Sequence, residues 1–257
     1  MSGHGAHYAH QQHYYDEATD PEFEIRRPRE CGRVYEFLIG EKFRAGMAVL
    51  GLDIRRRTVL ELCCGSGLMT EALARRGARV TGTDVSTHAL ERARERARRY
   101  GFAARFQAAD AEALPFRDGA FDIVAVHDGL HHLDAPEQAI REMARVARHA
   151  VLILEPARAA LTRLAVRLGL AEEVEAAGNH VHRLAAPELA AWLQAAGFPR
   201  ATWQRTLMYY PHEPWGWMRW LDPLPAFGLF VAGFRGVNLL AGRWGNKLAF
   251  AATREAR

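Results

Sequence analysis

Two glycines and two acidic residues in the first half of the chain have the spacing of a ligand-binding site. Glu61 lies in an apolar segment, Gly65 and Gly67 follow it, and Asp84 ends the next apolar segment. Glycines without side chains let a ligand approach the backbone closely. An acidic side chain at a strand end can accept hydrogen bonds from both hydroxyls of a ribose. The spacing therefore predicts a nucleoside site.

A third acidic residue extends this prediction to the base of the nucleoside. Asp110 follows the third predicted strand. For a bound adenosine, Asp84 would hold the ribose and Asp110 would accept from the adenine amino group. The backbone N–H of Ala111 would complete the adenine contact, and Glu61 with the glycine turn would hold the rest of the ligand.

Histidines follow the fourth predicted strand, where groups that face a reacting centre are expected. His127 and His131, with Asp128 between them, are the candidate catalytic residues. A histidine has a pKa suited to removing a proton near neutral pH. A structural role stays open, because His132 in the same run could simply hydrogen-bond the backbone.

Strands and helices alternate from residue 57 onward, and this order places the candidate residues together. Apolar runs predict strands at 58–62, 79–83, 104–107, 121–126, 150–154, 202–209 and 247–253. Helices are expected between them, one capped by Ser86 and one begun by a capping box of Asp134 and Glu137. Such alternation predicts an α/β fold with a doubly wound, mainly parallel sheet, which binds ligands at the carboxyl ends of its strands.

The segments outside this alternation are expected to cover the site. We predict an N-terminal arm with helices over the pocket (1–56), ahead of the binding domain (57–257). Tyr15 of the arm is included among the ligand contacts. Two C-terminal insertions, at about 156–184 and 210–245, are predicted as lids. The second insertion is rich in aromatic residues, so it could line a pocket for an apolar molecule or form a dimer interface.

Charge and cysteine usage narrow the class of protein. The chain has 34 Lys and Arg against 30 Asp and Glu, a net charge of only +4, which argues against nucleic acid as partner. The run from Glu91 to Arg99 mixes both signs and is expected to be a solvated helix face. Adjacent Cys63 and Cys64 suit a reducing cytoplasm. The apolar run from Leu224 to Phe234 is expected to be too short to span a membrane.

Five segments in register carry a family resemblance. These are Glu61-x-Cys63-x-Gly65-x-Gly67, Gly82 to Ser86, Asp110 to Phe116, Phe121 to Val124 and Leu130 to Leu133. Together they resemble class I S-adenosylmethionine-dependent methyltransferases, most closely the small-molecule branch that includes ubiquinone and menaquinone enzymes. One difference is visible, since that family commonly has glycine where Cys63 stands.

The resemblance implies a Rossmann-like seven-stranded sheet, S-adenosyl-L-methionine as cofactor, and methyl transfer to a small molecule in a biosynthetic pathway. It further implies that Glu61 and the turn around Cys63 hold the methionine end of the cofactor. Asp84 with Val85 would contact the ribose, Asp110 with Ala111 the adenine, and His127 the cofactor from the fourth strand.

Several alternatives stay open at this point. A nicotinamide site is disfavoured because Thr70 stands where the dinucleotide fingerprint needs a third glycine. Asp128-x-x-His131-His132 resembles a metal site of ubiquinone-pathway O-methyltransferases, but one short run seldom completes a coordination shell, so we expect no functional metal. The acceptor atom stays open, and arginines of the first insertion allow an acidic or diphosphorylated lipophile. The chain could also bind the cofactor without transfer, as a scaffold or cyclisation catalyst, or methylate RNA.

Overall fold

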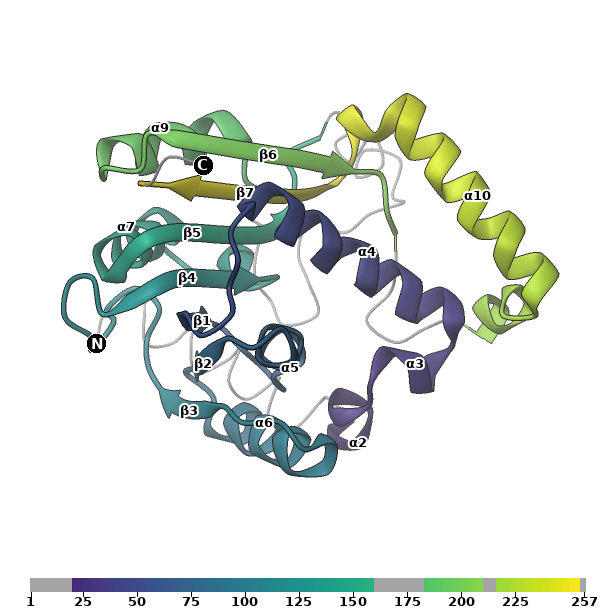
Figure 1. Ribbon diagram of the computed structural model, residues 1–257, viewed down its shortest axis with the longest axis horizontal. Coiled ribbons are helices and arrows are strands. Elements are labelled where there is room, and N and C mark those ends of the chain that lie inside the picture. Colours follow the sequence, from purple (N-terminus) through teal and green to yellow (C-terminus); the bar gives the residue numbers. More distant parts are fainter. Residues whose placement is uncertain (1–19, 160–182, 210–215, 255–257) are drawn as a thin grey trace.

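The sheet at the centre of the molecule has seven strands in the order β3-β2-β1-β4-β5-β7-β6. This computed structural model describes residues 20–159, 183–209 and 216–254 (Figure 1). The strands are β1 (Thr58–Leu62), β2 (Arg79–Asp84), β3 (Arg105–Ala108), β4 (Phe121–His127), β5 (Ala147–Pro156), β6 (Arg200–Thr206) and β7 (Lys247–Thr253). The expected α/β fold with seven strands is confirmed.

Strands β1 to β5 run parallel, and β7 lies antiparallel to both β5 and β6. Apolar side chains on both faces bury β1 and β4, as central parallel strands require. From β1 the chain adds β2 and β3 on one side, and it then returns to add β4 and β5 on the other side of β1. The winding direction therefore reverses between β1 and β4. The carboxyl ends of β1, β2 and β4 therefore meet at the switch point, where such sheets bind ligands.

Helices cover both faces of the sheet and bury two apolar clusters. On one face lie α7 (Pro136–Val146) and α9 (Ala186–Ala195), with Ile140, Met143 and Leu193 in the core. On the other lie α4 (Arg33–Leu50) and α5 (Leu68–Arg75), which bury Phe43 and Leu73. These two layers fix the strand ends as a rigid edge that carries the polar residues.

Two local expectations about helix termini have different outcomes. Ser86 caps α6 (Thr87–Tyr100) as predicted, since its hydroxyl accepts the N–H of Ala89 at 3.0 Å. The prediction of a capping box at Asp134 was wrong. The residue at the N-cap of α7 is Ala135, whose side chain cannot accept a capping hydrogen bond. The carboxylate of Glu112 accepts the N–H of Ala135 at 2.7 Å instead. The backbone N–H at the start of α7 is therefore satisfied by Glu112, a side chain far along the sequence, which the spacing of nearby residues cannot reveal.

The N-terminal segment docks on the binding domain through arginines. It contains α2 (Pro21–Ile25) and α3 (Pro28–Cys31) ahead of α4, and it runs beside α6 (Figure 1). Arg96 of α6 is 1% exposed and donates to the carbonyls of Glu24 and Arg26, at 2.6 and 3.0 Å, and to that of Ser66 in the glycine turn at 2.9 Å. The prediction of a solvated face for this run was therefore wrong at Arg96. The same arginine joins the N-terminal segment to the ligand turn.

The C-terminal insertion is mainly one helix, α10 (Leu224–Ala241), between two short 3₁₀ turns, η2 (Gly216–Leu221) and η3 (Gly242–Trp244). The helix continues past Arg235, so the apolar run is longer than the sequence predicted. Within the described residues, the segment from Leu224 to Trp244 is the one helix long and apolar enough to cross a membrane, by length and composition only. Tyr15 and most of the first insertion lie outside the described residues, and the division at residue 56 stays a prediction.

Candidate cofactor and acceptor site

The turn after β1 is held in an unusual backbone conformation by the residues of the motif. Cys63, Gly65 and Gly67 have φ values of 50°, 50° and 81°, a left-handed region that glycine enters without strain. The Asp84 carboxylate accepts the N–H of Gly65 at 2.9 Å and that of Ser86 at 3.0 Å. Asp84 thus fixes the turn and stands at its mouth, as the nucleoside prediction requires.

Cys63 occupies its strained position against the loop that follows β4. A methyl group added at Gly129 would lie 2.4 Å from the Cys63 Cβ and 3.0 Å from its Sγ. Burial raises the pKa of the Cys63 thiol well above its usual range, and the carboxylates of Asp84, Glu155, Glu61 and Asp110 raise it further. The thiol is therefore a packing group rather than a nucleophile.

We expect Gly129→Ala to destabilise the protein by about 2–4 kcal/mol, because no room exists for the new methyl beside Cys63. Gly129 has φ −126°, which any residue adopts, so only the contact opposes the change. Cys63→Gly removes the contact and relieves the positive φ, and it should restore most of the loss in the double variant. Urea unfolding of the four proteins measures this coupling. Strictly additive effects would contradict the packing described here.

Glu61 lies within the protein at the end of β1. Its side chain is 2% exposed and accepts a hydrogen bond from the Thr70 hydroxyl. Burial raises the pKa of Glu61 to about 8, with the Asp84 carboxylate adding to the rise and the Thr70 hydroxyl opposing it. A buried carboxylate of this kind needs a cation to be stable in its charged form. In the sequence Thr70 was noted only because it stands where a dinucleotide-binding motif would have a third glycine. In the structure it is the hydrogen-bond donor to Glu61.

The remaining predicted cofactor residues lie at the neighbouring strand ends. Asp110 accepts the N–H of Glu112 at 2.8 Å, which shapes the turn after β3, and Ala111 is buried beside it. The backbone of Ala109 donates to the carbonyl of Asp84 at 3.1 Å, so the ends of β2 and β3 are joined. Val85 is 42% exposed. The structure therefore brings together Glu61, Cys63, Gly65, Gly67, Asp84, Asp110 and Ala111, as the sequence predicts.

His131 belongs to a buried hydrogen-bonded pair. Its Nδ1 lies 2.6 Å from a Glu155 carboxylate oxygen, and Glu155 is 0% exposed. The other Glu155 oxygen accepts the N–H groups of Gly129 and Leu130, at 2.7 and 2.8 Å. Glu155 thus orients both the His131 ring and the loop after β4. No sequence motif pointed to Glu155, because it sits at the end of β5, far from the histidines along the chain.

His127 and Asp128 face a lysine from the N-terminal segment. Lys42 of α4 donates to Asp128, and Lys247 at the start of β7 lies 3.9 Å from the other Asp128 oxygen. These lysines hold the pKa of Asp128 well below its usual range, against the effect of burial. Burial, reinforced by the Lys42 charge, lowers the pKa of His127 to about 3, so this ring is neutral. Neither lysine was predicted from the sequence, since each reaches Asp128 from a distant element.

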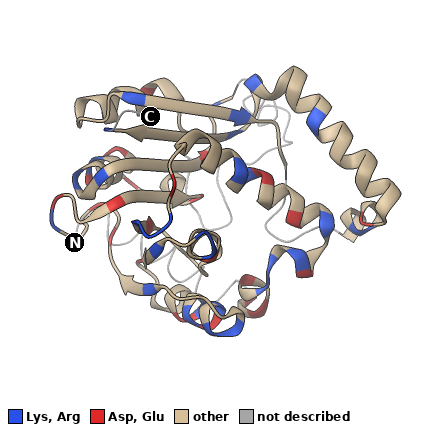
Figure 2. Ribbon diagram, viewed as in Figure 1, with Lys and Arg blue, Asp and Glu red and all other residues tan. Residues whose placement is uncertain are grey.

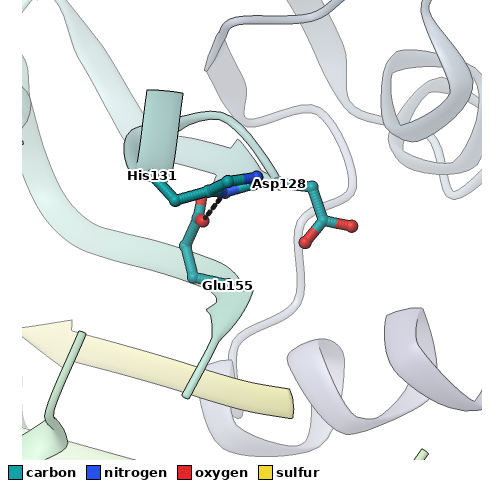
Figure 3. A group of neighbouring side chains, drawn as sticks. All are labelled: Asp128, His131 and Glu155. Atoms are coloured by element: carbon teal, nitrogen blue, oxygen red, sulfur yellow. Dashed lines mark hydrogen bonds and ion pairs between the residues drawn. The ribbon is translucent and has the colours of Figure 1, made fainter. Parts of the chain in front are cut away.

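Asp128, His131 and Glu155 also offer one ligand atom each within 4.8 Å of one another, a set that could hold a metal ion. Figure 3 shows that a hydrogen bond joins His131 to Glu155, while the Asp128 carboxylate stands apart from this pair. All three side chains already have partners, and the Lys42 ammonium bound to Asp128 would repel a cation. The residues therefore fit a hydrogen-bonded framework better than a metal centre.

Comparison with known proteins identifies the central part of the chain. Residues 60–154 match a family model described as a methyltransferase domain. A demethylmenaquinone methyltransferase of Thermus thermophilus is 36% identical over 116 residues, which are 44% of this chain and 53% of that protein. A ubiquinone biosynthesis O-methyltransferase of Cupriavidus pinatubonensis is 36% identical over 93 residues, 36% of this chain and 37% of that protein. The matches span about half the length of these relatives or less.

Solved structures extend the likeness over nearly the whole chain. The magnesium protoporphyrin IX methyltransferase of Synechocystis with bound S-adenosylhomocysteine has a TM-score of 0.62 at 19% identity, covering 95% of this chain and 98% of that one. A [4+2]-cyclase has a TM-score of 0.54 at 21% identity, covering 87% and 83%. At these identities the likeness establishes the fold.

Proposed function

We propose that this chain, whose residues 60–154 match a methyltransferase-domain model, is a class I S-adenosylmethionine-dependent methyltransferase. In this proposal it transfers a methyl group from S-adenosyl-L-methionine to a small, largely apolar molecule. The observation that carries the proposal is the group of four carboxylates around the Cys63 turn. Both the sulfonium and the ammonium of this cofactor are cations, and a buried acidic edge favours such a ligand. The acceptor then lies on the side of the loop after β4.

In this proposal three of the four carboxylates contact the cofactor, while Glu155 orients His131. Glu61 pairs with the cofactor ammonium, which supplies the charge that this buried acid lacks. Asp84 accepts from the ribose hydroxyls at the mouth of the turn, while Asp110 and the Ala111 N–H bind the adenine edge. When bound, the cofactor supplies an activated methyl group, so the protein mainly aligns the acceptor and excludes water.

The histidines divide the remaining work. The Glu155 carboxylate orients the His131 ring, as a carboxylate orients the histidine base of a catalytic triad. We assign to His131 the removal of a proton from an acceptor hydroxyl. His127 is too weak a base for this task because its pKa lies near 3. We assign to His127, with Asp128, the positioning of the acceptor beside the sulfonium.

A labelled-methyl assay tests the proposal directly. The full chain is incubated with methyl-labelled S-adenosyl-L-methionine and a metabolite extract, and labelled products are identified by mass spectrometry. Transfer to a small apolar molecule, with S-adenosylhomocysteine formed in equal amount, is the expected result. Tight cofactor binding without S-adenosylhomocysteine in any extract would favour the scaffold or cyclisation alternative. Label recovered in RNA would overturn the small-molecule assignment.

The compartment also belongs to the proposal. Cys31, Cys63 and Cys64 are all free thiols. Free thiols, two of them next to each other, suit a reducing compartment, and we therefore place the protein in the cytoplasm. Labelling of intact cells with a thiol reagent that cannot enter them checks this assignment, since a cytoplasmic protein should stay unlabelled.

A further inference from the structure

Helix α10 has an outer face of apolar side chains that lies open to solvent. Its outward leucines include Leu229, Leu239 and Leu240, which are 76%, 86% and 78% exposed. No residue of the helix is buried. Small residues lie between these leucines, and a Cβ added at Gly233 or Gly236 would meet nothing within 4 Å. Because apolar surface of this extent is costly in water, the outer face of α10 calls for a partner.

The inner side of α10 is fixed to the rest of the protein. Phe37 of α4 contacts three rings of the helix edge-on, at centroid distances of 6.1, 6.0 and 5.2 Å, those of Phe227, Phe230 and Phe234. The Asn238 side chain accepts the N–H of Leu207, just after β6, at 2.7 Å and donates to its carbonyl at 3.0 Å. These contacts set the rotation of the helix about its own axis. The outer leucines are therefore held outward by the fold.

The charged residues of this part of the chain have one sign. From residue 223 to 253 the sequence contains no Asp or Glu. Arg235 of the helix and Arg243 of η3 are both exposed, and Figure 2 shows α10 as an apolar helix with a single basic band. The acidic residue just ahead of the helix, Asp222, accepts the N–H of Val34 at 3.1 Å and so is turned toward α4. Positive charge on an apolar face is complementary to an apolar surface that carries negative charge.

Tryptophans lie at both ends of the helix. Trp220, 80% exposed, belongs to η2 just ahead of it, and Trp244 follows in η3 with Arg243 stacked over its ring at 4.0 Å. Tryptophan favours the headgroup level of a membrane, where its ring meets an apolar phase and its N–H meets water. The helix has 18 residues, a length of about 27 Å. Leucines along one face, with tryptophan and arginine around them, are typical of a helix that lies in a membrane interface.

A second copy of this chain is a poorer partner for the same face. A two-fold contact places the same residues on both sides of the interface. It would bring arginines together, and the segment from 223 to 253 has no acidic residue to pair with them. A bilayer with anionic headgroups supplies both the apolar phase and the negative charge. Charge complementarity therefore favours lipid over a second copy.

The contacts of the inner side also decide how the helix meets the membrane. By length and composition α10 could cross a bilayer. To do so it would have to leave Phe37, break both hydrogen bonds between Asn238 and Leu207, and carry Arg235 into hydrocarbon. A helix that lies in the interface keeps every one of these contacts, and its long arginine side chain reaches the headgroups.

We infer that the outer face of α10 docks on the surface of an anionic lipid bilayer, with the helix axis in the plane of the membrane. The leucines enter the boundary between headgroups and acyl chains, while Arg235 and Arg243 pair with the anionic headgroups. This docking goes beyond the proposed methyl transfer and does not depend on it.

Cosedimentation of the full chain with vesicles, without cofactor, tests the docking. The protein should bind vesicles of phosphatidylcholine mixed with phosphatidylglycerol, and bind pure phosphatidylcholine at least about fivefold less. Arg235→Gln should weaken binding to the anionic vesicles by about fivefold and leave binding to pure phosphatidylcholine unchanged. Failure of the wild type to bind either kind of vesicle would refute the inference.

Two substitutions on the outer face should act in opposite directions. Leu239→Glu should abolish most of the binding, whereas Gln204→Glu, which adds the same charge at an exposed position of β6, should not. Gly236→Leu should strengthen binding by at least about threefold, because the new side chain has open space around it and enters the lipid. A gain in affinity cannot arise from misfolding of the outer face.

The remaining outcomes are equally decisive. Urea unfolding should give the same stability for Leu239→Glu and the wild type, since Leu239 is exposed. Binding that survives Leu239→Glu, or that Gly236→Leu leaves unchanged, would show that lipid contacts another surface. Dimers in light scattering that Leu239→Glu dissociates, with no effect on vesicle binding, would assign the face to a second copy and overturn the inference.

Discussion

Glu61→Gln is expected to abolish cofactor binding and, at the same time, to stabilise the ligand-free protein at alkaline pH. The native pKa of Glu61 is about 8, against 4.5 for an ordinary glutamate. Between these values the folded protein holds a proton that the unfolded chain has lost. The stability contributed by this group is therefore fully present below pH 4.5 and is lost as the pH rises through 8. Glutamine is neutral throughout and avoids this loss.

The expected gain at pH 9 is roughly 2–4 kcal/mol, since one pKa unit corresponds to about 1.4 kcal/mol. Urea unfolding at pH 5 and pH 9 measures it, and the two proteins should differ mainly at the higher pH. Thr70→Val provides a matched variant. It removes the hydroxyl that lowers the pKa of Glu61, so this pKa should rise further and the loss of stability should continue to a higher pH than in the wild type.

Binding should show the opposite dependence on pH. The carboxylate must be ionised to pair with the cofactor ammonium, so wild-type affinity should rise between pH 6 and pH 7.5 and protons should be released on binding. The expected rise in affinity ends near pH 7.5 because the α-amino group of the cofactor has a pKa of about 7.7–8.0 and loses its own positive charge above it. Glu61→Gln should bind at least about 100-fold more weakly, with no such rise. Titration calorimetry measures both affinities. If Glu61→Gln bound the cofactor as tightly as the wild type, Glu61 would not be a cofactor-binding residue.

Arg96→Met is expected to destabilise the protein by about 3–5 kcal/mol, the cost of breaking a buried charged network. Methionine fills the space of the arginine stem but leaves the carbonyls of Ser66, Glu24 and Arg26 without their donor. It also removes a partner of Glu71, which is itself buried. The N-terminal segment should then open more readily, which limited trypsin digestion after Arg26 would detect.

Arg99→Met is the matched control, because Arg99 joins the same segment to the same helix. Its guanidinium donates to both oxygens of Glu22, at 2.7 and 3.0 Å, but this pair is solvent-exposed. Exposed ion pairs contribute little to stability because solvent screens them, so this variant should stay close to the wild type. Equal effects of the two substitutions would show that burial does not distinguish them, contrary to the structure.

The sequence predicted the parts of this fold that depend on local pattern. The strand at 58–62 and the strand at 247–253 have the predicted bounds, because apolar runs limited by polar residues specify them. The glycine turn was found for the same reason, since Gly65 and Gly67 are needed for its backbone angles. The rule that ligands bind at the ends of parallel strands singled out Asp84 and Asp110, and the structure places them at the end of β2 and just after β3.

What the sequence missed are the partners brought in by tertiary structure. Arg96 belongs to a run of alternating charges, and only the docked N-terminal segment buries it. Lys42, Lys247 and Glu155 lie on three different elements and meet at the loop after β4. The sequence predicted an apolar run that ends at Phe234, although the helix runs on past Arg235 to Ala241. A charged residue in sequence carries no sign of its burial, which depends on contacts far along the chain.

The scarcity of lysine makes this protein a natural subject for isotope labelling. Reductive methylation with ¹³C-formaldehyde would place a dimethylamino label on Lys42 and Lys247, and on no other side chain. The two resonances would report from both sides of Asp128. Lys42, with a pKa of about 8, should change its chemical shift within an accessible pH range. The chain thus carries two spectroscopic probes beside Asp128, without any engineered residue.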